Sequence, residues 1–407
     1  MHMQLCKYSE MNKGGQKLNT VQNDMLNIVQ YDVLGKLPDP FLFEDGTRVQ
    51  TKEDWGRRKK EFYRYVIELQ YGTMPPKPEV FSVETLYIGG KGRSNIYLIT
   101  AGTKEKTVSF RMRLHLPTGE KAAVYGEKRP PVIVDGDLAF CYAMDKEFLN
   151  TALDEGIQWA LFDRTELAHD VIGEGRRKGA LYDVYPDYTF GALGAWAWGY
   201  SRCVDALEVL GLSDMSCVAF TGHSRGGKTA ALAGALDERA AIVNPNETCA
   251  GACGCYRVHM EASYLDGKPN RSETLKDLLH YFDYWMGPDL APYAEREAEL
   301  PFDTHMLKAM VAPRMLFVSE AAGDIWSNPI GSWQTTMAAA EVFRFLGVPE
   351  NLYWYFRPGE HYHHITDVQM LVNLICMKTK GVAADERFFR LPFEKQKLIF
   401  DWRAPKD

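Results

Sequence analysis

The segment 216–236 holds a serine at a glycine-rich junction between two apolar stretches. The run Ser216-Cys-Val-Ala-Phe-Thr221 is followed by Gly222-His-Ser-Arg-Gly-Gly-Lys228 and then by the small-residue stretch 229–236. Glycines around a serine also occur in ordinary turns. A strand before the motif and a helix after it are typical of the nucleophile elbow, in which the serine is held strained and exposed. We therefore predict that Ser224 is a nucleophile.

Short apolar runs recur through the chain and alternate with stretches of helical periodicity. Strands that are buried on both faces have such continuous apolar runs, so the pattern predicts a mainly parallel sheet with helices on both sides. Segments of alternating apolar and polar residues precede it and predict antiparallel strands at one edge. With the elbow, these elements predict the α/β-hydrolase fold. The expected parallel strands are 131–135, 158–162, 217–220, 241–243, 314–319 and 352–356, and the antiparallel ones are 80–90, 94–101 and 107–116.

The chain is expected to fold as one catalytic domain behind an N-terminal arm. Residues 1–40 are polar and irregular, and Pro38 and Pro40 mark the entry to the folded body. The segment 52–71 has apolar residues at helical spacing and predicts an amphipathic helix. No internal repeat or low-complexity linker divides the remainder, so residues 41–407 are predicted to form a single domain.

Composition restricts the kinds of partner. The 407 residues carry a formal net charge of -7, with no block of basic residues interleaved with aromatics, so nucleic acid is not an expected partner. No apolar stretch reaches the length of a membrane span, so no membrane partner is expected. The chain is expected to be a monomer. The first residues lack the apolar core of a secretory signal. The sequence leaves the location of the protein open.

Three cysteines lie close together and raise the question of metal binding. Cys249, Cys253 and Cys255 form a Cys-x-x-x-Cys-x-Cys pattern with no fourth ligand nearby. A structural zinc site takes four ligands at set spacing. We therefore expect small buried thiols here and no metal site.

A serine nucleophile needs a base, which is usually a histidine after a late strand of this fold. Position selects the cluster Pro358-Gly-Glu-His-Tyr-His-His364, which follows the last predicted strand. Within it the turn at Gly359 favours His361, with His364 as the rival. His305 precedes a strand and is expected to be structural, and His223 is expected to point away from the serine hydroxyl.

Two carboxylates compete for the third position of the triad. Asp324 follows the predicted strand 314–319, where hydrolases of this fold most often place the acid. Glu247 lies in the loop after the strand 241–243. Position favours Asp324, but either residue fits a capping or solvated carboxylate equally well.

The elbow also carries two cations. The backbone N–H of Arg225, directly after the nucleophile, is placed for the oxyanion hole, and its guanidinium adds positive charge there. Lys228 lies one helical turn beyond Ser224 on the same face. Two cations beside the nucleophile suit an ester with a polar or hydroxylated acyl part, although both also fit solvated helix charges.

These residues resemble the glucuronoyl esterases of carbohydrate esterase family 15, in their bacterial form. The family's elbow reads Gly-Cys-Ser-Arg-x-Gly-Lys, and this chain has Gly222-His-Ser-Arg-Gly-Gly-Lys228. The resemblance covers roughly residues 50–380. Further similar segments are 196–202, 246–257, 300–305, 312–314 and 324–329.

The resemblance implies a role for each site residue. Its catalytic acid commonly lies 23 residues after the serine, which favours Glu247 here and leaves Asp324 as a backup. It also implies that Arg225 supports the oxyanion, that Lys228 binds hydroxyls of the glucuronate ring and that Trp326 lines the sugar site. An aromatic face packs well on a pyranose, although plain core packing of the tryptophan is the alternative.

The chain departs from the family at three places. Fungal members join the residue before the nucleophile to the one after the histidine by a disulfide, but here these are His223 and Tyr362, so that bridge is absent. The family's Glu-Ser-Gly becomes Glu247-Thr-Cys. A sugar-binding carboxylate of the relatives has Glu273 as its counterpart only through weak local similarity.

The resemblance therefore implies a serine esterase that cleaves esters of D-glucuronic or 4-O-methyl-D-glucuronic acid, as in glucuronoxylan–lignin linkages. The expected mechanism is an acyl-enzyme on Ser224, with His361 as base and no metal or organic cofactor. The alternatives are another carbohydrate esterase, such as an acetyl xylan esterase, and a catalytically silent carbohydrate-binding relative. The relatives are usually secreted or periplasmic.

Overall fold

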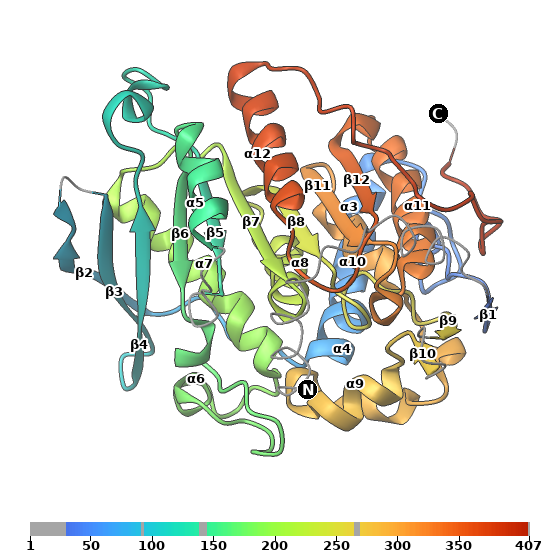
Figure 1. Cartoon of the computed structure of the whole chain (residues 1–407). Coiled ribbons are helices and arrows are strands. Elements are labelled where there is room, and N and C mark those ends of the chain that lie inside the picture. Colours follow the sequence, from blue (N-terminus) through green and yellow to red (C-terminus); the bar gives the residue numbers. More distant parts are fainter. Residues whose placement is uncertain (1–29, 91–92, 138–144, 264–268, 406–407) are drawn as a thin grey trace.

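A nine-stranded mixed sheet forms the centre of the molecule (Figure 1). The computed structural model describes residues 30–90, 93–137, 145–263 and 269–405. The strand order is β12-β11-β8-β7-β5-β6-β4-β3-β2. The parallel strands are β5 (Val132–Asp135), β6 (Gln158–Phe162), β7 (Val218–His223), β8 (Ala240–Asn246), β11 (Met315–Ala321) and β12 (Leu352–Arg357).

Three antiparallel strands extend the sheet at one edge. They are β2 (Val80–Ile88), β3 (Ser94–Gly102) and β4 (Thr107–His115), and β4 pairs with β6. Along β4 the side chains alternate between buried and exposed over most of its length, as expected for a strand with one face on the core. The predicted α/β-hydrolase sheet and its antiparallel edge are thus confirmed.

Helices cover both faces of the sheet (Figure 1). On one face, apolar side chains of β5 and β7 join those of α7, α8, α10 and part of α11 in the largest core. On the other face, Ile133 and Ala219 of the same strands join α5 and α12. The helices are α3 (Lys52–Phe62), α4 (Leu69–Tyr71), α5 (Asp145–Asp154), α6 (Ala180–Val184), α7 (Ala192–Leu210), α8 (Arg225–Leu236), α9 (Leu275–Phe282), α10 (Thr304–Val311), α11 (Pro329–Phe345) and α12 (Ile365–Lys380).

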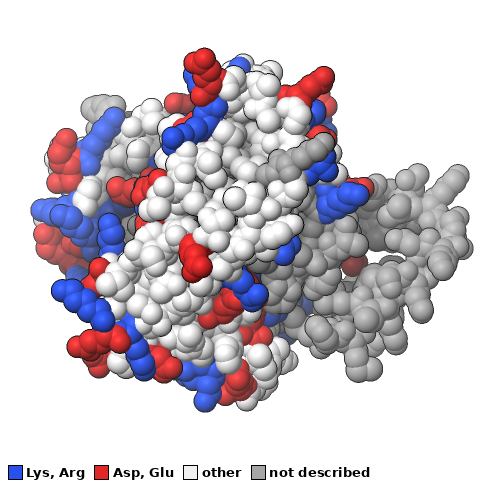
Figure 2. Space-filling model, turned by 90° about the vertical axis from the view of Figure 1, so that its left-hand side faces the viewer, with Lys and Arg blue, Asp and Glu red and all other residues white. Residues whose placement is uncertain are grey.

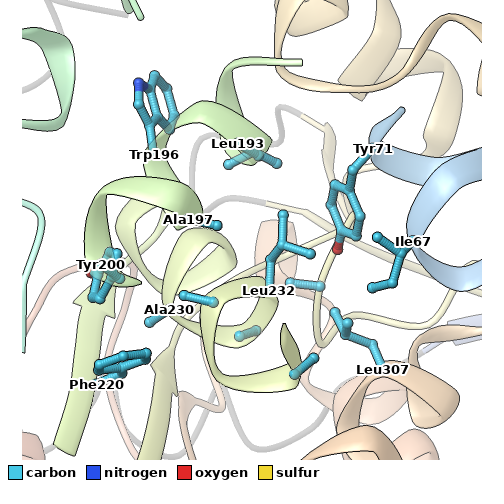
Figure 3. Packing of buried hydrophobic residues seen from close by; sticks show 14 of the residues in the cluster. Ile67, Tyr71, Leu193, Trp196, Ala197, Tyr200, Phe220, Ala230, Leu232 and Leu307 are labelled. Atoms are coloured by element: carbon cyan, nitrogen blue, oxygen red, sulfur yellow. The ribbon is translucent and has the colours of Figure 1, made fainter. Parts of the chain in front are cut away.

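Small residues let α8 approach the sheet closely. A Cβ placed on Gly234 would collide with Val243 of β8, and Ala230 of the same helix is fully buried. Figure 3 shows the larger side chains that surround this helix, Trp196 and Tyr200 from α7 among them. Because α8 carries the elbow at its first turn, this packing fixes the position of Ser224 relative to the sheet.

The predicted helix 52–71 is interrupted. It begins at α3, continues as a π-helical segment over Tyr63–Glu68 and ends with α4. The capping box formed by Thr51 and Asp54 explains its start. Gly72, with φ 87, ends it.

A small three-stranded sheet lies outside the central one and was not predicted. In it, β9 (Val258–Ser263) pairs with β1 (Gln30–Val33) and β10 (Pro269–Arg271). Of the predicted arm 1–40, residues 1–29 lie outside the described part. Within the described part, Leu37 is buried and β1 is paired, so residues 30–40 pack on the rest of the chain.

The surface carries both signs of charge. Figure 2 shows the side of the molecule at the edge strand β2, where Lys and Arg mix with Asp and Glu around a largely uncharged centre. Among the described helices, none combines the length and hydropathy needed to cross a bilayer.

His305 is a structural histidine at the start of α10. It is fully buried, its Nε2 lies 3.0 Å from the carbonyl oxygen of Pro38, and burial lowers its pKa from 6.5 to about 4. The unfolded chain therefore binds more protons than the folded one between these two pH values, so stability falls as the pH drops through that window.

We expect wild type to lose about 3 kcal/mol more unfolding free energy than His305→Gln between pH 6.5 and pH 4. Glutamine keeps an N–H for Pro38 but does not titrate. Urea unfolding at several pH values measures the difference. Parallel pH profiles for the two proteins would contradict the prediction.

Candidate active site

Ser224 lies at a sharp turn between β7 and α8. Its φ of 55° and ψ of −119° are unusual for a residue with a side chain. The turn is held because the Ser224 N–H donates to the carbonyl of Asn246, at the end of the neighbouring strand β8, at 2.9 Å. The backbone thus adopts the strained conformation that a nucleophile elbow requires.

The glycines of the elbow are required by close approach. A Cβ on Gly222 would lie 2.5 Å from the carbonyl carbon of Gly226. On Gly227 it would lie 2.6 Å from the carbonyl oxygen of Asn246, and on Gly226 it would collide with the Asp137 carboxylate. A methyl group at any of these positions would therefore displace the serine.

His361 is the histidine that reaches the serine. It lies in the loop after β12, and its Nε2 is 3.0 Å from Ser224 Oγ. The rival His364 instead caps the start of α12 and binds Thr366. The geometry therefore favours His361 as the base.

Two carboxylates flank the other ring nitrogen of His361. Asp324 Oδ2 lies 2.5 Å from His361 Nδ1, whereas Glu247 Oε2 lies at 3.5 Å. The order suggested by family resemblance, with Glu247 first, is thus the reverse of the order of distance. The reason is that Asp324 begins the short helical turn 325–327 after β11 and points its carboxylate directly at the ring.

Asp324 is itself held by Ser327. The Ser327 hydroxyl donates to Asp324 Oδ2, and its backbone N–H lies 3.2 Å from Oδ1. Since the single hydroxyl proton is used on Asp324, the Cys249 thiol, 3.1 Å from Ser327 Oγ, must be the donor in that contact. The hydroxyl and the backbone N–H of Ser327 therefore both orient the carboxylate that faces His361.

Arg357 holds the histidine loop from inside the protein. Its guanidinium donates to Glu247 Oε1, to Asp367 Oδ2 at 3.1 Å and to the carbonyl oxygen of Tyr362. The Tyr362 N–H in turn donates to Glu247 Oε2 at 3.0 Å. Glu247 therefore binds a cation and the loop backbone, and these contacts fix the loop that carries His361.

Burial and charge oppose each other at Glu247. Complete burial raises the pKa of this carboxyl well above its usual value, and the adjacent Arg357 guanidinium acts in the opposite direction. The Asp324 carboxylate also raises it. Because both oxygens of Glu247 accept hydrogen bonds, from the Arg357 guanidinium and from the Tyr362 N–H, these contacts favour the charged form against burial.

Two further histidines stack behind the base. The ring of His223 lies 4.9 Å from that of His361 and 5.5 Å, nearly parallel, from that of His363. His223 Nδ1 is 2.7 Å from Asn246 Oδ1, and burial lowers the pKa of His223 well below its usual value. A neutral ring therefore directly precedes the nucleophile.

His223, Glu247 and His361 also place one ligand atom each within 4.8 Å of one another. Both oxygens of Glu247 already accept hydrogen bonds, one of them from the Arg357 cation. This arrangement weakens the group as a ligand set for a metal ion. Cys249, Cys253 and Cys255 are buried free cysteines, and burial raises the pKa of each thiol.

The two elbow cations have different surroundings. Arg225 remains partly exposed and pairs with the buried Asp170 at 3.1 Å. Lys228 is almost wholly buried, donates to the carbonyl oxygen of Ala250 and pairs with Glu273 Oε2 at 2.9 Å. Lys228 is therefore not a solvated surface charge, and its partner is the carboxylate that weak local similarity had indicated.

Trp326 lies next to Asp324 and is only partly buried. Its carbonyl oxygen accepts a hydrogen bond from the Glu273 N–H at 3.0 Å. This bond connects the turn that begins at Asp324 to the segment after β10 that carries Glu273.

Sequence reasoning missed three residues of this site: Asp170, Ser327 and Arg357. One signal was available for Arg357, since it is a lone charge at the end of the apolar run 352–356. Ser327 lay inside a segment already singled out, 324–329. Nothing in the sequence near Asp170 marked it.

The sheet, the elbow and the hydrogen-bonded Ser224 and His361 define a serine hydrolase of the α/β-hydrolase class. The sequence matches a family model described as "Glucuronyl esterase, fungi" over residues 99–347. It is 31% identical over 333 residues to the 4-O-methyl-glucuronoyl methylesterase 1 of Wolfiporia cocos (strain MD-104), an alignment that covers 81% of this chain and 76% of the relative.

Solved structures of two glucuronoyl esterases are similar to this one. A carbohydrate esterase family 15 glucuronoyl esterase from Caldicellulosiruptor kristjansonii gives a TM-score of 0.77 at 27% identity, covering 96% of this chain and 100% of that one. The glucuronoyl esterase catalytic domain from Hypocrea jecorina gives 0.74 at 26%, covering 93% and 99%. The chain belongs to the glucuronoyl esterase family, and it is a carboxylic ester hydrolase.

We expect Arg357→Met to lower the free energy of unfolding by about 3–5 kcal/mol, because it leaves two buried carboxylates without their cation. Hydrolysis of any ester should fall with it, since the loop of His361 loses its anchor. Urea unfolding and an esterase assay measure both effects.

The matched control is Arg387→Met. Arg387 pairs with Asp385 at a partly exposed position, so its loss should change stability by at most about 1 kcal/mol. Equal stability of the two variants would contradict the anchoring role of Arg357.

Proposed function

We propose that this protein hydrolyses esters of D-glucuronic or 4-O-methyl-D-glucuronic acid, such as those that join glucuronoxylan side chains to lignin alcohols. The observation that carries the proposal is the buried Lys228–Glu273 pair one helical turn from Ser224. A charged, hydrogen-bonding pair near the nucleophile suits a hydroxylated acyl group better than a fatty chain, which offers no hydrogen-bonding group. The names of the relatives, 4-O-methyl-glucuronoyl methylesterases, support the same substrate class.

In this proposal Ser224 Oγ attacks the uronoyl carbonyl carbon while His361 Nε2 takes the hydroxyl proton. The C–O bond to the alcohol then breaks, and His361 returns the proton to the leaving oxygen. Water attacks the acyl-enzyme by the same route and releases free glucuronate. The 3.0 Å contact between the two residues supports this proton transfer. The reaction balances with water alone and needs no metal or organic cofactor.

We assign Asp324 as the acid that orients His361. Its 2.5 Å contact with Nδ1 supports this, and the ion pair between Glu247 and Arg357 supports a second role for Glu247. In that role Glu247 fixes the histidine loop and adds negative charge 3.5 Å from the imidazolium formed during reaction. In this assignment Asp324 orients the histidine, and Glu247 anchors the loop that carries it.

Charge on the reacting oxygen is stabilised by the elbow. The N-terminus of α8 presents its backbone N–H groups and the positive end of its dipole beside Ser224, and Arg225 adds a full positive charge. Lys228 and Glu273 are proposed to bind ring hydroxyls, and Trp326 to pack on the face of the sugar. Residues 41–407 would then form one catalytic domain.

Alcohol release from benzyl D-glucuronate should be lost in Ser224→Ala, and Lys228→Met should raise KM about ten- to a hundred-fold by removing a charged hydrogen bond. KM for 4-nitrophenyl acetate should change much less, because an acetyl group carries no hydroxyls. Urea unfolding of the variant is measured alongside, since Glu273 loses its buried cation. A wild-type enzyme inert on the glucuronate but active on acetylated xylan would contradict the proposal.

The assignment of the acid predicts an unequal response. Asp324→Asn should lower kcat by about 100-fold or more, since the neutral amide no longer stabilises the imidazolium. Glu247→Gln should lower kcat by less than about tenfold but destabilise the fold, because a buried Arg357 loses an anionic partner. The opposite ranking of kcat, with stability measured alongside, would make Glu247 the acid.

A further inference from the structure

Arg225 contacts two aromatic rings and one carboxylate. Its guanidinium carbon lies 4.8 Å from the ring centroid of Trp285 and 5.4 Å from that of Phe282, and these two rings stack at 3.9 Å with 5° between their planes. Its Nη1 donates to Asp170 Oδ2 at 3.1 Å. The side chain of Arg225 is thus restricted by a stacked aromatic pair and by one carboxylate.

Asp170 accepts hydrogen bonds on both oxygens although its side chain is only 1% exposed. Oδ2 binds Arg225 and, at 3.4 Å, Arg164 Nη2. Oδ1 binds the Tyr284 hydroxyl at 2.9 Å and the Trp285 indole N–H at 3.1 Å. Four donors therefore fix this carboxylate in one orientation.

The charges in this cluster keep Asp170 ionised. Burial alone would raise its pKa, but the Arg225 and Arg164 guanidiniums together hold the pKa of this carboxyl below its usual value. Arg164 is almost fully buried. Burial lowers the pKa of its guanidinium, and the nearby positive charge of Arg225 lowers it further. A negative charge between the two arginines lets both guanidiniums lie close together.

Most of the donors of Arg225 are left for a ligand. Within the described residues, Asp170 is the acceptor that its side chain binds, and it uses Nη1. A guanidinium carries five N–H groups, so those on Nε and Nη2 of this residue, which directly follows Ser224 in the chain, are not used by Asp170. An arginine fixed at one corner in this way stabilises developing charge without having to reorganise first.

We propose that Asp170 is a positioning residue for the transition state: it fixes the guanidinium of Arg225 so that its remaining N–H groups meet the oxyanion. The proposal rests on the proposed role of Arg225 at the oxyanion. It assigns the aromatic pair 282 and 285 a shared task, because the same tryptophan supports Arg225 with its ring and Asp170 with its N–H.

A purely structural role for Asp170, through Arg164, makes different predictions. Loss of structure would lower activity whether or not residue 225 is an arginine. Loss of positioning acts only through Arg225, lowers kcat and leaves KM nearly unchanged, since the oxyanion develops after binding. A double-mutant cycle between the two positions separates these cases.

Steady-state kinetics of the full chain test the proposal, with benzyl D-glucuronate and 4-nitrophenyl acetate as substrates. Asp170→Asn should lower kcat for both esters about ten- to a hundred-fold, with KM changed less than about threefold. In the Arg225→Ala background the same substitution should change kcat less than about twofold. The matched control is Glu166→Gln, a carboxylate of the same segment that pairs with Arg111, and it should leave both constants unchanged.

Tyr284→Phe provides a milder variant in case Asp170→Asn folds poorly. It removes one hydrogen bond to Asp170 and keeps the ring, so kcat should fall about two- to fivefold, and only when Arg225 is present.

Multiplicative effects of the Asp170 and Arg225 substitutions, an unchanged kcat in Asp170→Asn, or an unchanged kcat in Arg225→Ala would each overturn the proposal. The two esters separate this result from the proposed function. If the wild type is inert on the glucuronate but the cycle on 4-nitrophenyl acetate shows full coupling, the substrate proposal fails and the positioning role stands.

Discussion

The active site depends on one buried cation, Arg357, at the end of β12. Its guanidinium forms ion pairs with Glu247 and Asp367 and also donates to the carbonyl oxygen of Tyr362. The end of β8 is thereby joined to the histidine loop and the first turn of α12, which lie about 110 residues further along the chain. The anchored loop carries His361, whose Nε2 accepts a hydrogen bond from the Ser224 hydroxyl, so the ion pairs of Arg357 help to position the base of the nucleophile.

The same design recurs around the nucleophile. Each elbow cation has a buried carboxylate partner, Asp170 for Arg225 and Glu273 for Lys228. Buried charges of this kind cost desolvation energy and are stable only when paired with good geometry. At the elbow the same pairing fixes the orientation of Arg225 and Lys228, because paired side chains do not turn freely towards solvent. The surroundings of the elbow are therefore polar and held in fixed positions, which suits a hydroxylated acyl group better than an apolar one.

Much of the fold followed from local pattern. The parallel strands and the antiparallel edge strands were predicted from hydrophobic runs and alternation, because both depend on which faces are buried. The small sheet of β1, β9 and β10 was missed, since short, partly exposed strands such as β10 have no such pattern. The π-helical segment Tyr63–Glu68 was missed for a related reason, because its apolar spacing is close to that of an α-helix.

The sequence by itself determined the elbow, the serine, the histidine loop and the two cations, because these chemistries depend on residues that lie within one turn or one loop. It ranked the acids in two opposite ways, with Asp324 first by position and Glu247 first by family resemblance. Asp324 and Glu247 both follow strands of the same sheet, and parallel strands bring their carboxyl ends to one edge whatever their order in the chain. Only the tertiary structure shows that one carboxylate lies 2.5 Å from the histidine, while the other is paired with an arginine 110 residues away. Which charges become neighbours is decided by packing across the sheet, and local sequence carries no record of those distances.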